Sequence, residues 1–152
     1  MSNYDAVDLG YVSLLKDRRS RGLLKSYERT FVCAAAARSG QLEELKALRA
    51  ASFPWDATTC AYAAQGGRLE VLKWARANGC PWNEWTCSGA AGGGHLETLK
   101  WARANGCPWD ERTCMYAAER GHLEVLKWAR ANGCPWDEQT RYLAASMGYV
   151  ET

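Results

Sequence analysis

The chain has 152 residues, of which 47% are hydrophobic and 24% charged, and its formal net charge is +2. This composition supplies enough apolar side chains for a folded core and excludes a wholly disordered chain. The basic excess lies entirely in residues 1–30, which hold six Lys/Arg and four Asp/Glu. The remainder is neutral and lacks the strongly basic face that is typical of nucleic-acid-binding proteins.

Transmembrane and secreted classes are also disfavoured. No apolar stretch approaches the roughly 20 residues that cross a bilayer, and the N-terminal residues lack the basic and apolar segments of a secretory signal. Without such a signal, the odd number of seven cysteines indicates reduced thiols rather than a disulfide framework. We therefore expect a cytoplasmic or nuclear protein that does not associate with membranes.

The sequence repeats itself every 27 residues. The pentapeptide Asn-Gly-Cys-Pro-Trp ends at Trp82, Trp109 and Trp136, and Pro54-Trp55 retains its last two residues one period earlier. A pair of alanines, two variable residues and then a glycine recur with the same period, and these pairs begin at Ala36, Ala63, Ala90, Ala117 and Ala144. A fixed period of this length is typical of a solenoid of stacked repeats.

The copies can be assigned in chain order. Residues 1–28 are interpreted as a degenerate N-terminal repeat or cap, because residues 10–19 resemble residues 67–76 but lie two periods plus three residues upstream. Residues 137–152 form a truncated copy that stops where a second helix would begin, so we interpret the chain as a fragment. The complete copies between them span 29–55, 56–82, 83–109 and 110–136.

Each copy is predicted to contain two short helices, as residues 110–136 illustrate. Asp110 is a favourable N-cap for a helix over 111–119, and Gly121 can adopt the left-handed conformation that ends it. A second helix is predicted over 122–132, where Gly133 supplies the next stop. Helices this short are marginal alone in water, so their stability must come from packing against neighbouring copies.

Two columns of tryptophan follow the period. An indole buries 150–250 Å² in a typical core, so we expect these rings to form interior ladders between copies. An aromatic platform that binds sugars or lipids is the alternative. The columns are Trp74, Trp101 and Trp128, and Trp55, Trp82, Trp109 and Trp136.

The segment 121–134, Gly-His-Leu-Glu-Val-Leu-Lys-Trp-Ala-Arg-Ala-Asn-Gly-Cys, resembles the second helix of an ankyrin repeat, and Ala117–His122 resembles the end of the first. The resemblance covers residues 29–152 and, more weakly, 10–28. Ankyrin repeats are usually near 33 residues, and the six missing here would fall in the β-hairpin finger. The Thr-Pro-Leu-His motif is also absent. The resemblance implies an all-α solenoid of stacked antiparallel helix pairs with short loops in place of the fingers.

Some positions differ among the copies that start at residues 56, 83 and 110. Their spacing of i, i+3, i+4 and i+7 places them on one face of the first helix. In ankyrin proteins the first helices line the concave surface where partners bind, so the resemblance implies a recognition strip for an unidentified protein partner. A solvated face that drifts neutrally is the alternative, and we expect a monomer in either case. The strip comprises Trp85, Arg112, Met115, Tyr116, Glu119 and Tyr142.

The cysteines follow two further columns, one in the first helices and one in the loops. The spacing from Cys80 through Cys87 to His95 resembles a zinc site, but Cys87 and His95 lie near opposite ends of one helix, roughly 12 Å apart. One zinc ion cannot bond both. We interpret the thiols as small buried apolar groups and predict neither a metal nor a cofactor, with a cysteine-based metal-binding repeat as a remote alternative. The columns are Cys33, Cys60, Cys87 and Cys114, and Cys80, Cys107 and Cys134.

Catalysis has little support in the sequence. The two histidines each begin a second helix, and Gly92-Gly93-Gly94 follows no predicted strand, so it is not a phosphate-binding loop. We predict that the protein is not an enzyme, has no small-molecule substrate, and serves as a protein–protein interaction scaffold or adaptor. A structural spacer within a longer protein is the alternative. A run of basic residues is interpreted as a solvated edge, with a weak nucleic-acid contact as the alternative: Lys16, Arg18, Arg19, Arg21, Lys25 and Arg29.

Overall fold

A computed structural model of the protein describes the backbone of residues 3–150 and the side chains of residues 11–150. This part of the chain forms ten helices and no strand, so the predicted all-α class is confirmed. The helices are α1 (Asn3–Ser20), α2 (Ser26–Arg38), α3 (Leu42–Ala50), α4 (Ala57–Gln65), α5 (Leu69–Ala77), α6 (Glu84–Gly92), α7 (Leu96–Ala104), α8 (Glu111–Glu119), α9 (Leu123–Ala131) and α10 (Glu138–Ser146).

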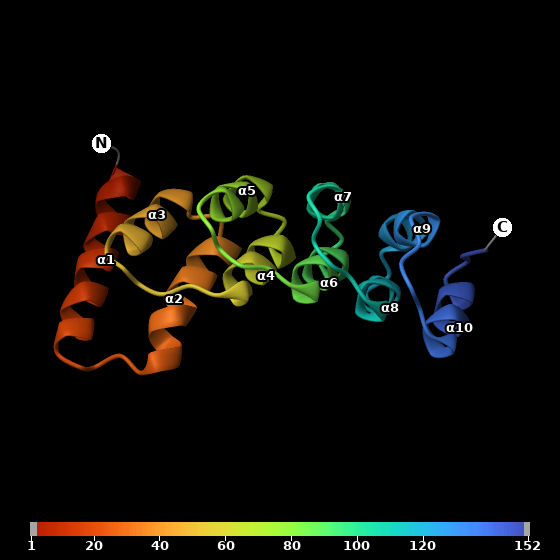
Figure 1. The fold of residues 1–152 in the computed structure, drawn as a ribbon, viewed down its shortest axis with the longest axis horizontal. Helices are drawn as coiled ribbons and strands as arrows, with labels where there is room; N and C mark the ends of the chain where they lie inside the picture. The colour runs from red at the N-terminus through yellow and green to blue at the C-terminus, as the bar shows by residue number, and fades with distance from the viewer. Residues whose placement is uncertain (1–2, 151–152) are drawn as a thin grey trace.

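After α1, the helices alternate between two rows (Figure 1). The first row contains α2, α4, α6, α8 and α10, and each of these helices packs against the next one in the row. The second row contains α3, α5, α7 and α9, each packed against the first-row helix that precedes it in the chain. Helix α1 packs against α3, and the two ends of the chain lie at opposite ends of the molecule.

The helix boundaries follow the residues that predicted them. The Asp110 carboxylate accepts a hydrogen bond from the backbone N–H of Arg112 at 3.0 Å and so caps the start of α8. Gly121 (φ +77°) and Gly133 (φ +86°) adopt the left-handed conformation where α8 and α9 end. Both predicted helices of this copy are therefore confirmed, the second with one residue fewer at each end.

Small side chains fill most of the core where first-row helices meet. On α6 the buried residues are Thr86, Cys87, Ser88, Ala90 and Ala91. A Cβ atom added to Gly93, just past the end of α6, would lie 2.6 Å from the Gln65 carbonyl oxygen, which belongs to the last residue of α4. Small residues therefore allow neighbouring helices of this row to approach within van der Waals contact of backbone atoms.

The predicted tryptophan contacts do join neighbouring copies, but the prediction that these rings lie in the interior is wrong. All seven indoles of the two columns are only half-buried, and they pack on the edge of a core made of alanine, cysteine and leucine. Six of the rings meet in pairs, one ring from each column, edge to face, and Trp136 meets Tyr149 in the same way. The Pro-Trp loops hold their indoles at the rim, where the following second helix meets them. The ring-centroid distances are 5.7 Å for Trp55–Trp74, 5.8 Å for Trp82–Trp101 and 5.9 Å for Trp109–Trp128.

An arginine completes each tryptophan pair. Arg76 Nη1 donates a hydrogen bond to the Cys80 carbonyl at 2.7 Å, and its guanidinium lies 4.2 Å from the centroid of the Trp82 ring. The same two contacts recur one and two periods later. We call this feature the arginine–tryptophan edge. It consists of four groups, each with one arginine and two aromatic rings: Arg49 with Trp55 and Trp74; Arg76 with Trp82 and Trp101; Arg103 with Trp109 and Trp128; and Arg130 with Trp136 and Tyr149.

In the described part of the chain, the predicted N-terminal segment contains one whole helix and the start of another, and the predicted C-terminal segment contains one helix. Residues 3–28 hold α1 and the first turn of α2, and residues 137–150 hold α10. The outermost positions of both predicted segments, residues 1–2 and 151–152, lie outside the described residues. None of the described helices has the length and apolar character needed to span a bilayer.

Candidate protein-binding surface

The six residues of the predicted strip lie on three first-row helices. Trp85 is on α6 and 47% exposed, and Tyr142 is on α10 and 81% exposed. The other four are on α8, where Glu119 is exposed and Arg112, Met115 and Tyr116 are half-buried. The strip is therefore accessible along this row of helices.

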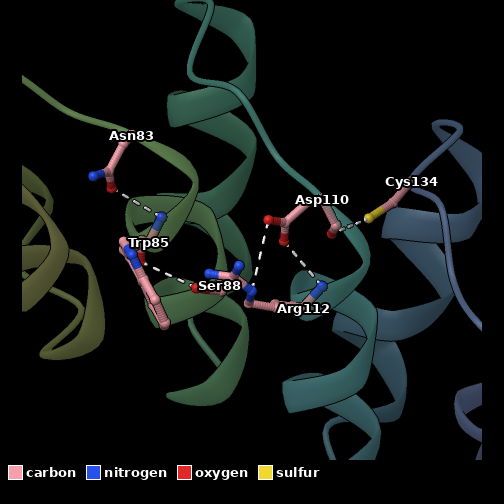
Figure 2. Close-up of polar contacts among 6 residues, drawn as sticks. All are labelled: Asn83, Trp85, Ser88, Asp110, Arg112 and Cys134. Atoms are coloured by element: carbon pink, nitrogen blue, oxygen red, sulfur yellow. Dashed lines mark hydrogen bonds and ion pairs between the residues drawn. The ribbon is translucent and has the colours of Figure 1, made fainter.

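Trp85 and Arg112 form a polar and aromatic cluster that joins α6 to α8 (Figure 2). The Arg112 guanidinium lies 4.6 Å from the centroid of the Trp85 ring, and its Nε is 3.8 Å from the Asp110 carboxylate. Asn83 Oδ1 in turn accepts a hydrogen bond from the Trp85 backbone N–H at 3.0 Å. The helix caps thus hold a tryptophan and an arginine side by side on the exposed face.

Next to this cluster is a hollow of about 620 Å³ that spans α4, α6 and α8. Its floor includes Gly89 and Gly92, and Tyr62 and Tyr116 line it from the neighbouring helices. The hollow exists because the copy at 83–109 has glycine where the copies on both sides have tyrosine, and glycine again where they have glutamine or glutamate. A Cβ atom on Gly92 would meet only the Tyr116 side chain, whereas one on Gly89 would lie 3.0 Å from the Ala61 carbonyl oxygen. The absent side chain at Gly92 therefore leaves the surface open, and Gly89 lets α6 lie close to α4.

The charged residues that line the hollow are both basic. Arg38 lies at the end of α2 and Arg120 just past the end of α8. Neither guanidinium forms an ion pair with a carboxylate in the described part of the chain. Asn83, at the edge of the hollow, replaces the Asp56 and Asp110 caps of the neighbouring copies, so this cap carries no charge. The hollow is consequently a positively charged site.

The structure brings together only part of the predicted strip. Trp85 and Tyr116 line the hollow and Arg112 contacts Trp85, whereas Met115, Glu119 and Tyr142 lie outside it. Three lining residues that carry the site were not predicted. Tyr62 and Arg120 lie in the copies that were compared, Tyr62 in a variable column and Arg120 in place of the glycine at 66 and 93. Arg38 lies one period before the compared copies, so extending the comparison to the copy 29–55 could have found it.

Aromatic side chains extend this surface toward the N-terminal end. The Phe31 and Tyr62 rings meet edge to face with their centroids 6.0 Å apart. Phe31 is exposed on α2, and Tyr27 is exposed one helical turn earlier. The exposed face of the first row therefore carries aromatic rings from α2 to α8.

The cysteines lie apart from this surface. All seven are free thiols and buried, which confirms their interpretation as small core residues. Burial raises the pKa of Cys33 to about 12, with Arg49 opposing the change only in part. A hydrogen bond with Cys107, and then burial, raise the pKa of Cys87. Cys33 and Cys87 are therefore protonated at neutral pH, a state that makes them poor nucleophiles and poor metal ligands.

Within residues 11–150, no group of three or more histidine, cysteine, aspartate or glutamate side chains is placed to hold a metal ion. Comparison of the chain with protein-family models finds no match, and a search of curated proteins finds no similar sequence. The candidate surface must therefore be interpreted from its own residues.

Proposed function

We propose that the protein is a non-catalytic protein-interaction module, a scaffold or adaptor arm that binds a protein partner through its first-helix face. The observation that carries this proposal is the division of the 27-residue unit into two classes of position. Repeated positions make the contacts within and between copies, whereas variable positions gather on one exposed face around a hollow. A surface that changes while its scaffold stays constant is suited to recognition.

The residues of that face support the proposal. Tryptophan, tyrosine and arginine are the residues most enriched at the energetic centres of protein interfaces. Here Trp85, Arg112 and Tyr116 lie together and at least partly accessible, and Arg112 is already oriented by its contacts with Trp85 and Asp110. An oriented side chain loses less conformational freedom when a partner binds.

The architecture we propose is an ankyrin-like solenoid of stacked antiparallel helix pairs with short loops in place of β-hairpin fingers. Two observations support it: each first-row helix packs against the next, and the arginine–tryptophan contacts recur every 27 residues. A linear stack in which each copy contacts its neighbours is the arrangement of solenoid proteins. Free buried thiols favour a reducing compartment, so we propose a monomeric protein of the cytoplasm or nucleus.

Site-specific photo-crosslinking tests the proposed function. A photoreactive phenylalanine analogue replaces Tyr116 in the hollow, and in a matched control it replaces Lys127, which is exposed on second-row helix α9. We expect cell extract to yield one discrete crosslinked protein from position 116 and none from position 127. The crosslink should disappear in the combined Arg112→Ala, Met115→Ala and Glu119→Ala variant.

A structural spacer is the alternative function. The near-identity of the second helices favours it: the sequence Leu-Glu-Val-Leu-Lys-Trp-Ala-Arg-Ala occurs at 69–77 and again at 123–131. A spacer should give no discrete crosslink from either position in a chain whose circular dichroism is fully helical. If crosslinking from position 116 persisted in the triple variant, the three substituted residues of the predicted strip would not contribute to partner binding.

A further inference from the structure

We infer that the hollow binds an acidic peptide segment of the partner, which inserts one aromatic side chain between Tyr62 and Tyr116 and places carboxylates on Arg38 and Arg120. This inference rests on the proposed function and names the chemistry of the partner. Three observations carry it: the shape of the hollow, the rings that line it, and the sign of its charge.

The shape of the hollow matches an inserted side chain. Neighbouring copies have tyrosine at the position of Gly89 and glutamine or glutamate at the position of Gly92. A Cβ atom added to Gly92 would meet only the Tyr116 side chain, at 3.4 Å, so the space above this residue is open. A Cβ atom added to Gly89 would instead lie 3.0 Å from the Ala61 carbonyl oxygen, because this residue packs against α4. The open space therefore lies above Gly92, where a single large residue from another chain can enter.

The lining favours an aromatic ring in that space. Tyr62 and Tyr116 are half-buried and border the hollow from helices on either side of α6, and Trp85 lines it as well. Edge-to-face and offset-stacked ring pairs contribute about 0.5–1.5 kcal/mol beyond the area they bury. The chain already uses this geometry beside the hollow, where Phe31 and Tyr62 meet edge to face.

The charge selects an acidic segment. Arg38 and Arg120 line the hollow without an intramolecular ion pair, so their charges are available to a ligand. Of the carboxylates that cap the neighbouring first helices, Asp56 accepts hydrogen bonds from Thr58, and Asp110 accepts one from the Arg112 N–H. A basic peptide would be repelled, whereas carboxylates would form charge-assisted pairs with the two guanidinium groups.

The spacing of these groups limits the length of the peptide. Arg38 lies at the end of α2 and Arg120 just past the end of α8, and these two helices are three packing steps apart along the row. Three steps of 8–10 Å amount to about 24–30 Å, which an extended chain covers in roughly seven to nine residues. The hollow lies over α6, two steps from Arg38 and one from Arg120. The aromatic residue should therefore stand nearer one acidic residue than the other.

Selection from a phage-displayed library of random twelve-residue peptides tests this inference on the whole chain. We expect the enriched peptides to share an aromatic residue flanked by aspartate or glutamate. A synthetic peptide of the enriched sequence, carrying a fluorophore, then gives the affinity by fluorescence anisotropy. Enrichment of neutral or basic peptides, or no enrichment at all, would overturn the inference.

Two sets of variants locate the bound peptide. Gly92→Gln installs the residue that occurs at position 65 and should weaken binding at least about tenfold by filling the hollow, whereas Gly92→Ala should change it less than about threefold. Arg38→Glu combined with Arg120→Glu should weaken binding by about tenfold or more and reduce its salt dependence. Lys16→Glu combined with Arg18→Glu, at two exposed residues of α1, is the control for the same change in net charge.

The outcomes separate the inference from the proposed function. A peptide whose affinity is equal for the wild type and Gly92→Gln, with equal thermal unfolding of the two proteins, does not occupy the hollow and overturns the inference. If the discrete crosslink at Tyr116 nevertheless forms and is lost in the triple variant, the protein-binding function stands without the acidic peptide. If the crosslink is also absent, both fail.

Discussion

The arginine–tryptophan edge and the hollow are built from the same 27-residue unit, yet they obey different rules. Along the edge, Arg76, Arg103 and Arg130 make the same carbonyl hydrogen bond at 2.6–2.7 Å and lie at the same 4.2 Å from a tryptophan ring. Around the hollow, the equivalent positions 62, 89 and 116 carry tyrosine, glycine and tyrosine. The repeated residues perform a task that every copy needs, and the variable ones do not.

This difference indicates how the chain can acquire a binding site without loss of stability. The contacts that join the copies involve the buried side of the first helices and the Pro-Trp loops, so residues on the exposed side can change independently. Substitutions on the two sides should therefore have unequal effects on unfolding. The first three predictions below each compare a position that holds the structure together with a matched position that does not.

The largest effect on stability should come from the second-helix leucines. Leu99 on α7 is fully buried, whereas Tyr142 on α10 is 81% exposed. We expect Leu99→Ala to lower the free energy of unfolding by about 2–5 kcal/mol because it leaves a cavity. Tyr142→Ala should change it by no more than about 0.5 kcal/mol. Urea unfolding monitored by circular dichroism measures both, and similar losses would show that the exposed face also supports the stack.

Two adjacent glycines provide a closer comparison. A Cβ atom on Gly93 would lie 2.6 Å from both the Gln65 carbonyl oxygen and the His95 ring, whereas one on Gly92 would meet only Tyr116. Gly93 has φ −83°, so alanine would suffer crowding there but no backbone strain. We expect Gly93→Ala to destabilise the protein by about 1–3 kcal/mol.

Gly92→Ala is the control, and its effect should be neutral or slightly stabilising, because alanine favours a helix over glycine by up to about 1 kcal/mol. Urea midpoints at unchanged slope measure both effects. Equal stability of the two variants would mean that the approach of α4 to the end of α6 is not limited by the glycine.

The next effect concerns the edge itself. Arg103 Nη1 donates to the Cys107 carbonyl at 2.6 Å, and its guanidinium lies over Trp109. Arg103→Lys keeps the charge but loses the planar group that makes both contacts, so we expect a loss of about 1–2 kcal/mol. Lys100→Ala removes an exposed ion pair with Glu97 and should cost no more than about 0.5 kcal/mol. A loss from Arg103→Lys no larger than that of Lys100→Ala would contradict a structural role for the edge.

Local signals made the helices predictable. Asp110 and Gly121 specify where α8 begins and ends through hydrogen bonds and a backbone conformation that involve only nearby residues. The buried alanines and cysteines were predictable for a related reason, since a residue repeated at every 27th position has the same environment in each copy. The all-helical class and the boundaries in the copy 110–136 followed from these features.

Contacts between distant side chains were not predictable in the same way. The position of the Trp82 ring depends on the direction in which its loop presents the side chain. The 27-residue spacing of the tryptophans contains no information about this direction. The hollow required both the glycines of one copy and the approach of Arg38 and Arg120 from helices on either side. A variable column indicates that a position is free to change, but the packing of three helices decides whether the change opens a cavity.

The smallest expected effect is a pH dependence confined to one helix cap. Asp137 Oδ1 accepts a hydrogen bond from the Thr140 N–H at 2.7 Å, and this bond lowers the pKa of the exposed Asp137 carboxyl below its ordinary value of 3.8. Because the folded pKa lies below the unfolded one, the cap stabilises α10 fully above about pH 4 and loses this contribution as the pH falls through the folded pKa. The amide cap of Asn83 on α6 cannot titrate.

Amide hydrogen exchange resolved by residue distinguishes the two caps. On acidification from pH 5 to pH 3, corrected for the intrinsic exchange rate, the first-turn amides of α10 should lose protection while those of α6 keep it. Asp137→Asn preserves an oxygen that can accept the Thr140 hydrogen bond but removes the titrating proton, so it should abolish the difference. A loss of protection at Thr140 that is unchanged in Asp137→Asn would assign the pH dependence to the unfolding of α10 as a whole. The cap would then contribute too little to be measured at the end of the row.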